Sequence, residues 1–307
     1  AKAFMHRHHL PTAASKTVHS AIEAHAEATL MGLPLVLKKD GLAAGKGVVI
    51  ANDAATLDDT IEQFYAGHPD ATVLLEEYLA GEEASVMALF NDQKRVILPL
   101  SQDHKRRHAA DRGPNTGGMG AISPLPQFKP DQVQAAQSLV DATLAGMHQD
   151  GLNGHGVMYI GLIFTKEGPK ILEYNMRFGD PETQVLLPQI ENDFYQLVSD
   201  LLDGQQPTLK LNGQAYACFV AVNPDYPRAN LKTVPVIVPT NWPIGTWLPA
   251  GVERTDNGWI SDAGRIFSVV AGAVTLPEAV AKAKHDLESI QGVLDYRTDI
   301  GFHALKG

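Results

Sequence analysis

The stretch ILEYNMRFGDPETQ at residues 171–184 is the most informative part of this sequence. Glu173 and Asn175 are two residues apart in a segment with strand character, so we expect both side chains on one face. A carboxylate and an amide oxygen placed together suit Mg²⁺ held between protein and nucleotide phosphates. Arg177 follows, and its guanidinium is suited to stabilise a transferring phosphoryl group. The alternative is that Glu173 pairs with a core arginine, which fits poorly with the polar residues that follow.

A glycine-rich segment further upstream, VLKKDGLAAGKGVVI at residues 36–50, has the composition of a phosphate-binding hairpin. Gly41, Gly45 and Gly47 let backbone N–H groups approach phosphate oxygens closely, and Lys38 and Lys46 can offset the phosphate charge. The P-loop motif is excluded, because it needs four residues between its glycines and Ser or Thr after its lysine. A plain hairpin with a flexible tip remains the alternative.

Two further polar segments lie between these. LLEEYLAGEEAS at residues 74–85 carries four carboxylates after a strand, and one of them could accept hydrogen bonds from ribose hydroxyls. SQDHKRRHAADRGPNTGGMGA at residues 101–121 combines an acid, several bases and a glycine run, which favours a loop that holds a small zwitterion and a phosphate. For each segment the alternative is a solvated surface.

Composition narrows the class of protein. The chain has 307 residues and a formal net charge of −10, which argues against a nucleic-acid-binding protein. No apolar run reaches the ~20 residues that a membrane helix needs, and the first residues lack the apolar core of a signal peptide. The single cysteine, Cys218, lies in an apolar run and cannot form an internal disulfide. We therefore expect a cytoplasmic protein.

The hydrophobic pattern predicts an α+β fold in two domains. Helices are predicted at 15–31, 53–67, 130–150, 181–203 and about 277–291. Strands are predicted at 32–40, within 41–50 after the glycine-rich turn, and at 72–79, 83–91, 94–101, 156–165, 169–175, 215–223 and 265–273. Residues 102–127 are predicted to be loop-like, and a loop of this length favours a role in binding. The composition changes at GQQPTL, residues 204–209, which contains polar residues, Gly and Pro. This change sets the predicted boundary between domains 1–203 and 204–307.

Two other polar segments give weaker indications of a functional site. The histidines of HRHH, residues 6–9, have no nearby carboxylate or cysteine to complete a metal site. Tyr296, Arg297 and Asp299 near the chain end indicate at most a salt bridge.

Taken together, the motifs KKDGLAAGKG, LEEYLAGEEAS, SQDHKR, GPNTGGMGA and EYNMRFGDPETQ resemble the phosphoribosylamine–glycine ligase family, in the order in which that family has them. The resemblance extends from PTA at 11–13 to DIG at 299–301. It implies an ATP-grasp fold, with the nucleotide held between two α+β lobes, followed by a small α+β domain. It also implies that ATP phosphorylates the carboxylate of glycine and that the amine of 5-phosphoribosylamine then displaces phosphate.

The same resemblance implies roles for individual residues. Lys38 and the loop of Gly41, Gly45, Lys46 and Gly47 would contact ATP phosphates, with Lys38 and Arg177 as the catalytic residues. Glu76, Tyr78 and Leu79 would line the adenine, and Glu83 would bind the ribose. Glu173 and Asn175 would hold Mg²⁺ or Mn²⁺. The residues expected to face glycine and phosphoribosylamine are Asp103, Lys105, Thr116, Gly117, Gly118, Met119, Gly120, Asp180, Pro181 and Glu182.

Three departures from the family pattern qualify the resemblance. The family's N-terminal domain, which helps to bind phosphoribosylamine, has no counterpart here, and Lys2 falls just after the position of an ATP-contacting lysine. The glycine-rich turn of the C-terminal domain is VNPDYPRAN in this chain. We therefore expect a piece of a longer enzyme, acting on small molecules, without nucleic acid or membrane partners, as a monomer or weak dimer. The alternatives are a catalytically incomplete ATP-binding fragment and another ATP-grasp carboxylate–amine ligase.

Overall fold

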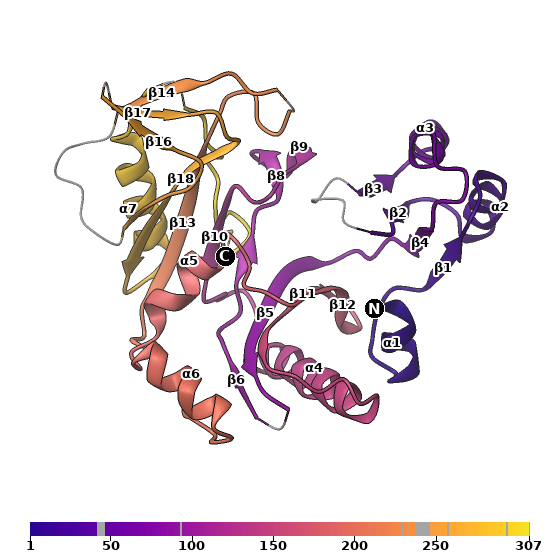
Figure 1. Ribbon diagram of the computed structural model, residues 1–307, viewed down its shortest axis with the longest axis horizontal. Helices are drawn as coiled ribbons and strands as arrows, with labels where there is room; N and C mark the ends of the chain where they lie inside the picture. The colour runs from indigo at the N-terminus through magenta and orange to yellow at the C-terminus, as the bar shows by residue number, and fades with distance from the viewer. Residues whose placement is uncertain are drawn as a thin grey trace. The chain divides into compact units, whose positions relative to one another are not determined.

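The chain forms two compact units in the computed structural model, which describes residues 1–41, 47–92, 94–228, 230–237, 246–256, 258–292 and 294–306 (Figure 1). The first unit comprises Ala1–Glu82 and Ile163–Leu172, and the second comprises Glu83–Leu162 and Glu173–Gly307. The division falls inside two strands, β11 (Gly156–Thr165) and β12 (Gly168–Asn175).

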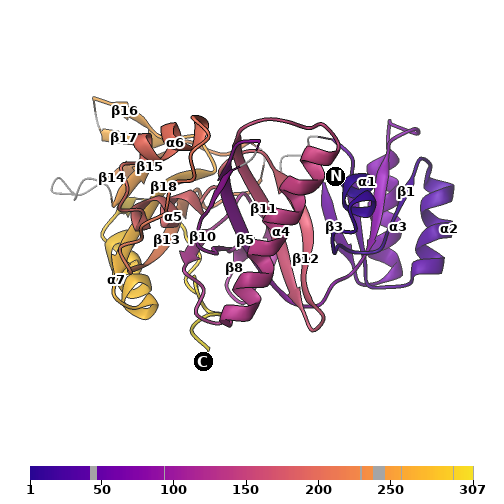
Figure 2. The ribbon, with the colours of Figure 1, turned by 90° about the horizontal axis from the view of Figure 1, so that it is seen from below.

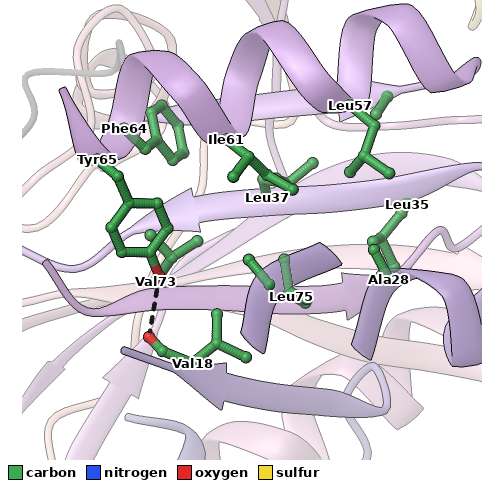
Figure 3. Packing of buried hydrophobic residues seen from close by; sticks show 12 residues of the cluster. Val18, Ala28, Leu35, Leu37, Leu57, Ile61, Phe64, Tyr65, Val73 and Leu75 are labelled. Atoms are coloured by element: carbon green, nitrogen blue, oxygen red, sulfur yellow. Dashed lines mark hydrogen bonds between the residues drawn. The ribbon is translucent and has the colours of Figure 1, made fainter. Parts of the chain in front are cut away.

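The first unit is built on a four-stranded antiparallel sheet with the order β1-β4-β2-β3. Its elements are α1 (Lys2–Arg7), β1 (Ser15–Val18), α2 (Ala21–Met31), β2 (Leu35–Lys39), β3 (Val48–Ala51), α3 (Ala54–Tyr65) and β4 (Val73–Glu77). The helices α2 and α3 contact each other and the sheet, so both cover the same face. Leu57, Ile61 and Phe64 recur at helical spacing on α3 and pack over Leu37 of β2 (Figure 3).

Helix starts in this unit follow from local capping. Asp53 accepts a hydrogen bond from the N–H of Thr56 and begins α3, as the sequence predicts. Ser20 accepts one from Glu23 and begins α2, whereas the sequence predicts a helix from residue 15. That prediction is wrong for residues 15–18, because Val18 is fully buried in β1 and the strand pairs with β4.

The second unit contains a five-stranded sheet with the order β15-β18-β13-β10-β7. The strands are β7 (Gln102–Asp103), β10 (Gly120–Ser123), β13 (Ala215–Val222), β15 (Trp247–Pro249) and β18 (Arg265–Ala273). Helix α7 (Leu276–Glu288) packs on β13 and β18 (Figure 2), and it begins with a capping box between Thr275 and Glu278. The central strand of this sheet, β13, is buried along nearly its whole length.

Another sheet has the order β12-β11-β5-β6, with β5 (Glu82–Phe90) and β6 (Arg95–Ile97). Helix α4 (Pro130–Gln149) lies beside it, since Thr143 hydrogen-bonds Tyr174 of β12 and Asp141 pairs with Arg95 of β6. The two predicted strand pairs, 83–91 with 94–101 and 156–165 with 169–175, are confirmed.

Two sequence predictions in this unit need correction. Residues 102–127 are not simply a loop, because they contain β7, β10 and a hairpin of β8 (Arg106–His108) and β9 (Arg112–Asn115). Residues 181–203 are not one helix but α5 (Thr183–Leu186), a 3₁₀ turn (Leu187–Gln189) and α6 (Phe194–Leu202). Pro188 interrupts the helical hydrogen bonding, and Asp193 caps a new start by accepting from the N–H of Gln196.

The remaining strands form a small sheet with the order β16-β17-β14-β19. They are β14 (Val234–Ile237), β16 (Glu253–Thr255), β17 (Gly258–Ser261) and β19 (Gln291–Gly292). Among the described residues, no helix has the length and apolar character needed to cross a membrane.

Candidate functional site

Glu76 is the centre of the polar group in the first unit. It lies on β4 beside β2, opposite Val36, and is almost fully buried. Its Oε1 is 2.9 Å from Lys2 Nζ and its Oε2 is 2.8 Å from Lys38 Nζ. Lys38 also donates a hydrogen bond to the carbonyl of Leu172. The Glu76 side chain therefore forms ion pairs with two lysines. The sequence did not predict this role.

Burial and the shared carboxylate act on Lys2 in opposite directions. Desolvation lowers the pKa of Lys2, and the ion pair with Glu76 opposes that shift. Because one carboxylate faces two ammonium groups, the cluster carries an excess of positive charge. That charge is suited to an anionic ligand such as a nucleotide phosphate.

The glycine-rich hairpin begins and ends as the sequence predicts. Lys38 pairs with Val48 across β2 and β3, and the N–H of Lys39 donates to the carbonyl of Gly47. Gly41 has φ +112°, a conformation that favours glycine. Gly45 and Lys46 lie outside the described residues. Tyr78 is exposed and Leu79 half-buried just beyond β4.

In the second unit, Lys105 lies among carboxylates. Its Nζ is 3.3 Å from Glu83 Oε2 and 3.7 Å from Glu173 Oε1. Burial disfavours its charge, but Glu83 and the other acids around it raise the pKa of Lys105 well above its usual value. Lys105 is therefore a permanent cation at the point where the predicted ribose and metal residues come together.

A second carboxyl pair lies beside this lysine. Burial, and then the charge of Glu182, raise the pKa of Asp103 well above its usual value. Burial also raises the pKa of Glu182, whose Oε1 is 3.3 Å from the Ser85 hydroxyl. Ser85 in turn donates to the hydroxyl of Tyr159. Two close carboxyl groups that both resist ionisation form a site where a proton can be held or transferred.

The loop of residues 116–120 closes over Asp103. Thr116 donates to the carbonyl of Lys105 through both its N–H and its hydroxyl, and its Oγ1 accepts from the N–H of Gly118. Gly118 has φ +111°, and a Cβ there would lie 2.4 Å from Pro181 Cδ and 2.8 Å from Asp103 Oδ1. Only glycine fits between these two groups.

Arg265 joins this loop to Asp180. Its guanidinium donates to the carbonyl of Gly117 and lies 2.7 Å from Asp180 Oδ2. Tyr226 accepts a hydrogen bond from the N–H of Gly117 through its hydroxyl. Sequence reasoning missed Arg265 and Tyr226, since their partners are far away in the chain and no local motif marks them.

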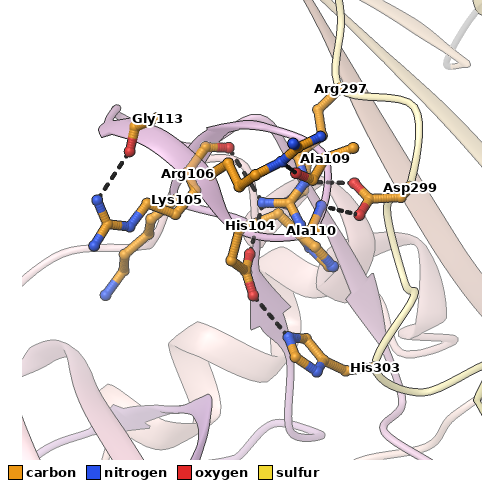
Figure 4. Close-up of polar contacts among 12 residues, drawn as sticks. His104, Lys105, Arg106, Ala109, Ala110, Gly113, Arg297, Asp299 and His303 are labelled. Atoms are coloured by element: carbon orange, nitrogen blue, oxygen red, sulfur yellow. Dashed lines mark hydrogen bonds and ion pairs between the residues drawn. The ribbon is translucent and has the colours of Figure 1, made fainter.

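The side chains of the basic run HKRRH, residues 104–108, lie in different environments. His104 is buried, and it accepts a hydrogen bond from the N–H of Gly301 through Nε2. Burial lowers the pKa of His104 to about 3, so the ring is neutral. Arg106 donates to the carbonyl of Gly113, and Arg107 pairs with Asp295 (Figure 4 shows His104, Lys105 and Arg106). Lys105 alone faces the predicted site.

Three other predicted residues differ in exposure. Arg177 is exposed and donates to the carbonyl of Phe178. Met119 is fully buried, and its backbone pairs with His104 and Val220, so its side chain has a packing role. Gly120 needs the absence of a side chain, because a Cβ would lie 2.4 Å from the carbonyl oxygen of Cys218.

Comparisons with known proteins all lead to one family. Residues 1–183 match the family model of the phosphoribosylglycinamide synthetase ATP-grasp (A) domain, and residues 216–303 match that of its C domain. The phosphoribosylamine–glycine ligase of Halalkalibacterium halodurans is 39% identical over 312 residues, which are 99% of this chain and 73% of that protein. That of Streptococcus pneumoniae is 39% identical over 319 residues, covering 100% of this chain and 75% of that protein.

Solved structures give the same result. The phosphoribosylamine–glycine ligase of Thermotoga maritima superposes with a TM-score of 0.87 at 32% identity, covering 97% of this chain and 77% of that chain. The biotin carboxylase domain of Hydrogenobacter thermophilus 2-oxoglutarate carboxylase has a TM-score of 0.70 at 18% identity, covering 95% of this chain and 65% of that chain. The second likeness concerns the fold alone.

Proposed function

Because the chain belongs to the phosphoribosylamine–glycine ligase family, we propose that the polar clusters described above carry out each step of ATP-dependent ligation of glycine to 5-phosphoribosylamine. Membership makes the chain an ATP-grasp protein and an ATP-dependent carbon–nitrogen ligase of purine biosynthesis. The assignment of steps to residues is the proposal.

The observation that carries the proposal is the environment of Lys105 and Asp103. Lys105 stays cationic among acids, and Asp103 and Glu182 favour their protonated forms. Such a site offers a cation for the carboxylate of glycine, and the carbonyl oxygens of the two protonated carboxyl groups can accept hydrogen bonds from an amine. In the first half-reaction the glycine carboxylate takes the γ-phosphoryl group of ATP. In the second, the amine nitrogen bonds to the acyl carbon, the C–O bond to phosphate breaks, and the nitrogen loses a proton to solvent water.

In this proposal Lys38 supplies positive charge to the ATP phosphates, and Arg177 supplies it to the transferring phosphoryl group. Lys38 is held by Glu76 with its ammonium fixed, so little side-chain entropy is lost when phosphate binds. Arg177 is exposed and has a planar guanidinium that matches phosphate oxygens. No covalent protein intermediate is needed, because positioning and charge neutralisation supply the rate.

Glu173 and Asn175 fit a divalent metal. Both are on β12, two residues apart, and within the described part of the chain the Glu173 side chain is held by one ion pair, 3.7 Å to Lys105. Gly161 on β11 lies against Glu173, where a Cβ would come within 2.9 Å of Glu173 Cγ, so the carboxylate has room. Mg²⁺ or Mn²⁺ held there would neutralise charge on the nucleotide phosphates. Within the described ranges no group of three or more His, Cys, Asp or Glu side chains could hold a metal, so the nucleotide would complete the coordination.

The proposal extends to organisation and setting. We keep 1–203 and 204–307 as the ATP-grasp and C-terminal domains, which the separate family models support. The two compact units of the fold have different bounds from these domains. The boundary at residue 204 lies inside the second unit, where β10 pairs with β13. We also propose a monomer or weak dimer in the cytoplasm; sedimentation and cell fractionation test these points.

The test is ADP release with ATP, Mg²⁺, glycine and freshly made phosphoribosylamine, leaving out one component at a time. We expect release only when all are present. Release that does not depend on glycine would refute the ligase assignment. ATP binding without any release would support an incomplete nucleotide-binding fragment instead.

A substitution separates the metal proposal from folding. Glu173→Gln keeps the shape of the side chain but removes the charge that meets a cation, so turnover should fall by at least two orders of magnitude with an unchanged melting temperature. Glu167→Gln is the matched control, because Glu167 is an exposed residue between β11 and β12. Full activity of Glu173→Gln would show that the metal lies elsewhere.

A further inference from the structure

The segment of residues 296–303 lies near the chain end, and no step of the proposed reaction uses it. The salt bridge that the sequence indicates there is confirmed, because Arg297 Nε lies 2.7 Å from Asp299 Oδ1. The Arg297 side chain, with 0% exposure, also lies 2.8 Å from Asp111 Oδ1, and its Nη1 donates a hydrogen bond to the carbonyl of Arg106 at 3.2 Å. One buried guanidinium therefore joins the chain end to the β8–β9 hairpin.

Two backbone N–H groups extend this connection. Asp299 Oδ2 accepts a hydrogen bond from the N–H of Ala110 at 2.7 Å (Figure 4). The buried His104 accepts one through Nε2 from the N–H of Gly301 at 2.9 Å. The chain end therefore contacts residues 104–111 at the beginning of this segment, in its middle and at the turn of the hairpin.

These contacts lie on both sides of Lys105 in the chain. His104 precedes it and Arg106 follows it, and each is held by a residue of the chain end. The carbonyl of Lys105 itself accepts two hydrogen bonds, from the N–H and from the hydroxyl of Thr116. Because three successive residues of the backbone are held, the ammonium of Lys105 has a restricted range of positions.

The turn of the hairpin is strained and depends on the same contacts. Ala110 and Asp111 have φ of 56° and 51°, in the left-handed region that residues other than glycine rarely adopt. Such strain persists only where the surroundings hold it. Here Asp299 holds Ala110, while Arg297 and His303 hold Asp111 (Figure 4). Loss of the Arg297 contacts would therefore release the turn as well as the strand.

Arg297 is better suited to fix a geometry than to stabilise the fold. Removing two charges from water costs much of what their pairing returns, so a buried ion pair adds little stability over well-packed apolar side chains. Nη2 of Arg297 is also buried, without a hydrogen-bond partner among the described residues, which adds to the cost. The planar guanidinium does provide direction, because its nitrogens reach Asp111, Asp299 and the carbonyl of Arg106 at fixed angles.

We propose that Arg297 is a positioning residue for the ligation, which with Asp299 holds the backbone around Lys105 so that the Lys105 ammonium meets the carboxylate of glycine. Arg297 contacts no reactant and acts through Lys105. The role of Lys105 toward glycine rests on the proposed function, whereas the attachment of the hairpin to the chain end follows from the contacts of Arg297 and Asp299.

Amide hydrogen exchange of the full chain, followed by mass spectrometry, tests the attachment without any substrate. Arg297→Lys keeps the positive charge, but one ammonium cannot reach all three acceptors of the guanidinium. Exchange at Thr116 and Met119 should become faster, because their N–H groups donate to the carbonyls of Lys105 and His104. Exchange in β2 and β4 of the first unit should stay unchanged.

A second variant decides the matter if Arg297→Lys does not fold. Asp299→Asn removes the charge that pairs with Arg297 and leaves one oxygen for the two donors that Asp299 now accepts from. It should speed exchange at Thr116 to a smaller extent. Arg95→Lys is the matched control, because Arg95 forms an ion pair with Asp141 of α4 and should alter neither the exchange at Thr116 nor the kinetics.

Kinetics separate positioning from a purely structural role. In Arg297→Lys the KM for glycine should rise about tenfold while the KM for ATP stays unchanged, because a displaced Lys105 loses a charge-assisted contact to the glycine carboxylate. A variant that only folds less completely would contain less active enzyme, so its kcat would fall while its KM for glycine stayed at the wild-type value.

The two readouts fail in different ways. Unchanged exchange at Thr116 and Met119 in both variants would overturn the attachment of the hairpin. Faster exchange with an unchanged KM for glycine would overturn the positioning role. If the wild type shows no glycine-dependent ADP release, the proposed function fails, and the exchange still decides whether Arg297 holds the hairpin.

Discussion

His104 should make the protein sensitive to mild acid. Its ring is buried in the second unit, 2% exposed, with Nε2 accepting from the N–H of Gly301 and Nδ1 3.3 Å from the carbonyl of Gly120. This pattern requires the neutral tautomer with its proton on Nδ1. A second proton on Nε2 would destroy the bond to Gly301 and bury a charge near Arg297.

The sign and size of the effect follow from linkage. Burial lowers the folded pKa of His104 to about 3, whereas an unfolded histidine titrates near 6.5. The stabilising contribution is therefore complete above pH 6.5 and is lost as the pH falls toward 3, because only the unfolded chain then binds the proton. Each pH unit in that window costs about 1.4 kcal/mol, so the loss between pH 6.5 and 4 is about 3 kcal/mol. That is a large fraction of the ~5–15 kcal/mol that stabilises a typical domain.

The assay is urea unfolding followed by tryptophan fluorescence at several pH values between 7.5 and 4. His104→Gln keeps one amide donor and one acceptor but cannot be protonated. It should be less stable at pH 7.5 by about 1–3 kcal/mol for the altered hydrogen bonds. The gap should then close by about 3 kcal/mol toward pH 4, since only the wild type loses the histidine contribution. The shifted carboxyl groups are present in both proteins, so the difference between the slopes isolates His104.

Parallel stability curves for the wild type and His104→Gln would refute the reasoning. So would an imidazole that titrates near 6.5 by NMR in the folded protein. His155→Gln is the control, because His155 is exposed and should not alter the pH dependence.

Two further substitutions test the described packing. Glu76→Gln leaves Lys2 and Lys38 without their shared counter-ion, and we expect a loss of about 3–5 kcal/mol in the free energy of unfolding; an unchanged thermal midpoint would mean that the pairs contribute nothing. Gly118→Ala forces a Cβ against Asp103 and strains a left-handed backbone, so stability should fall by more than about 1 kcal/mol and the KM for glycine should rise. Differential scanning calorimetry and initial rates measure these effects, and a Gly118→Ala protein with wild-type KM and midpoint would contradict the geometry.

Elements with a local signal were predictable from the sequence. The helical spacing of apolar residues over 53–67 predicts α3, and a helix is predicted at about 277–291, where α7 lies; both predictions are confirmed. Residues 120–123 carried no such signal. They form β10 because they pair with β13 and β7, and a pairing between distant segments cannot be seen in a local pattern.

The candidate site shows the same limit. The motifs led to Lys105, Asp103 and Glu173 because charged residues beside glycines stand out in a sequence. The residues that hold them do not stand out: Ser85 and Tyr159 come from strand interiors, and Arg265 reaches Asp180 across 85 positions. The two ion pairs of Glu76 with Lys2 and Lys38 also depend on strand register, which the sequence alone did not define.

The order of strands in the five-stranded sheet has a consequence for synthesis. β10 leaves the ribosome long before β13, its partner in the centre of the sheet, and α4, β11, β12 and α6 are made between them. At ordinary elongation rates of about 5–20 residues per second, one edge of β10 waits for several seconds without its partner. An open strand edge invites pairing with another chain. A nascent or C-terminally shortened form should therefore depend on chaperones. The last third of the chain supplies the strands that complete a sheet whose first strands are made much earlier.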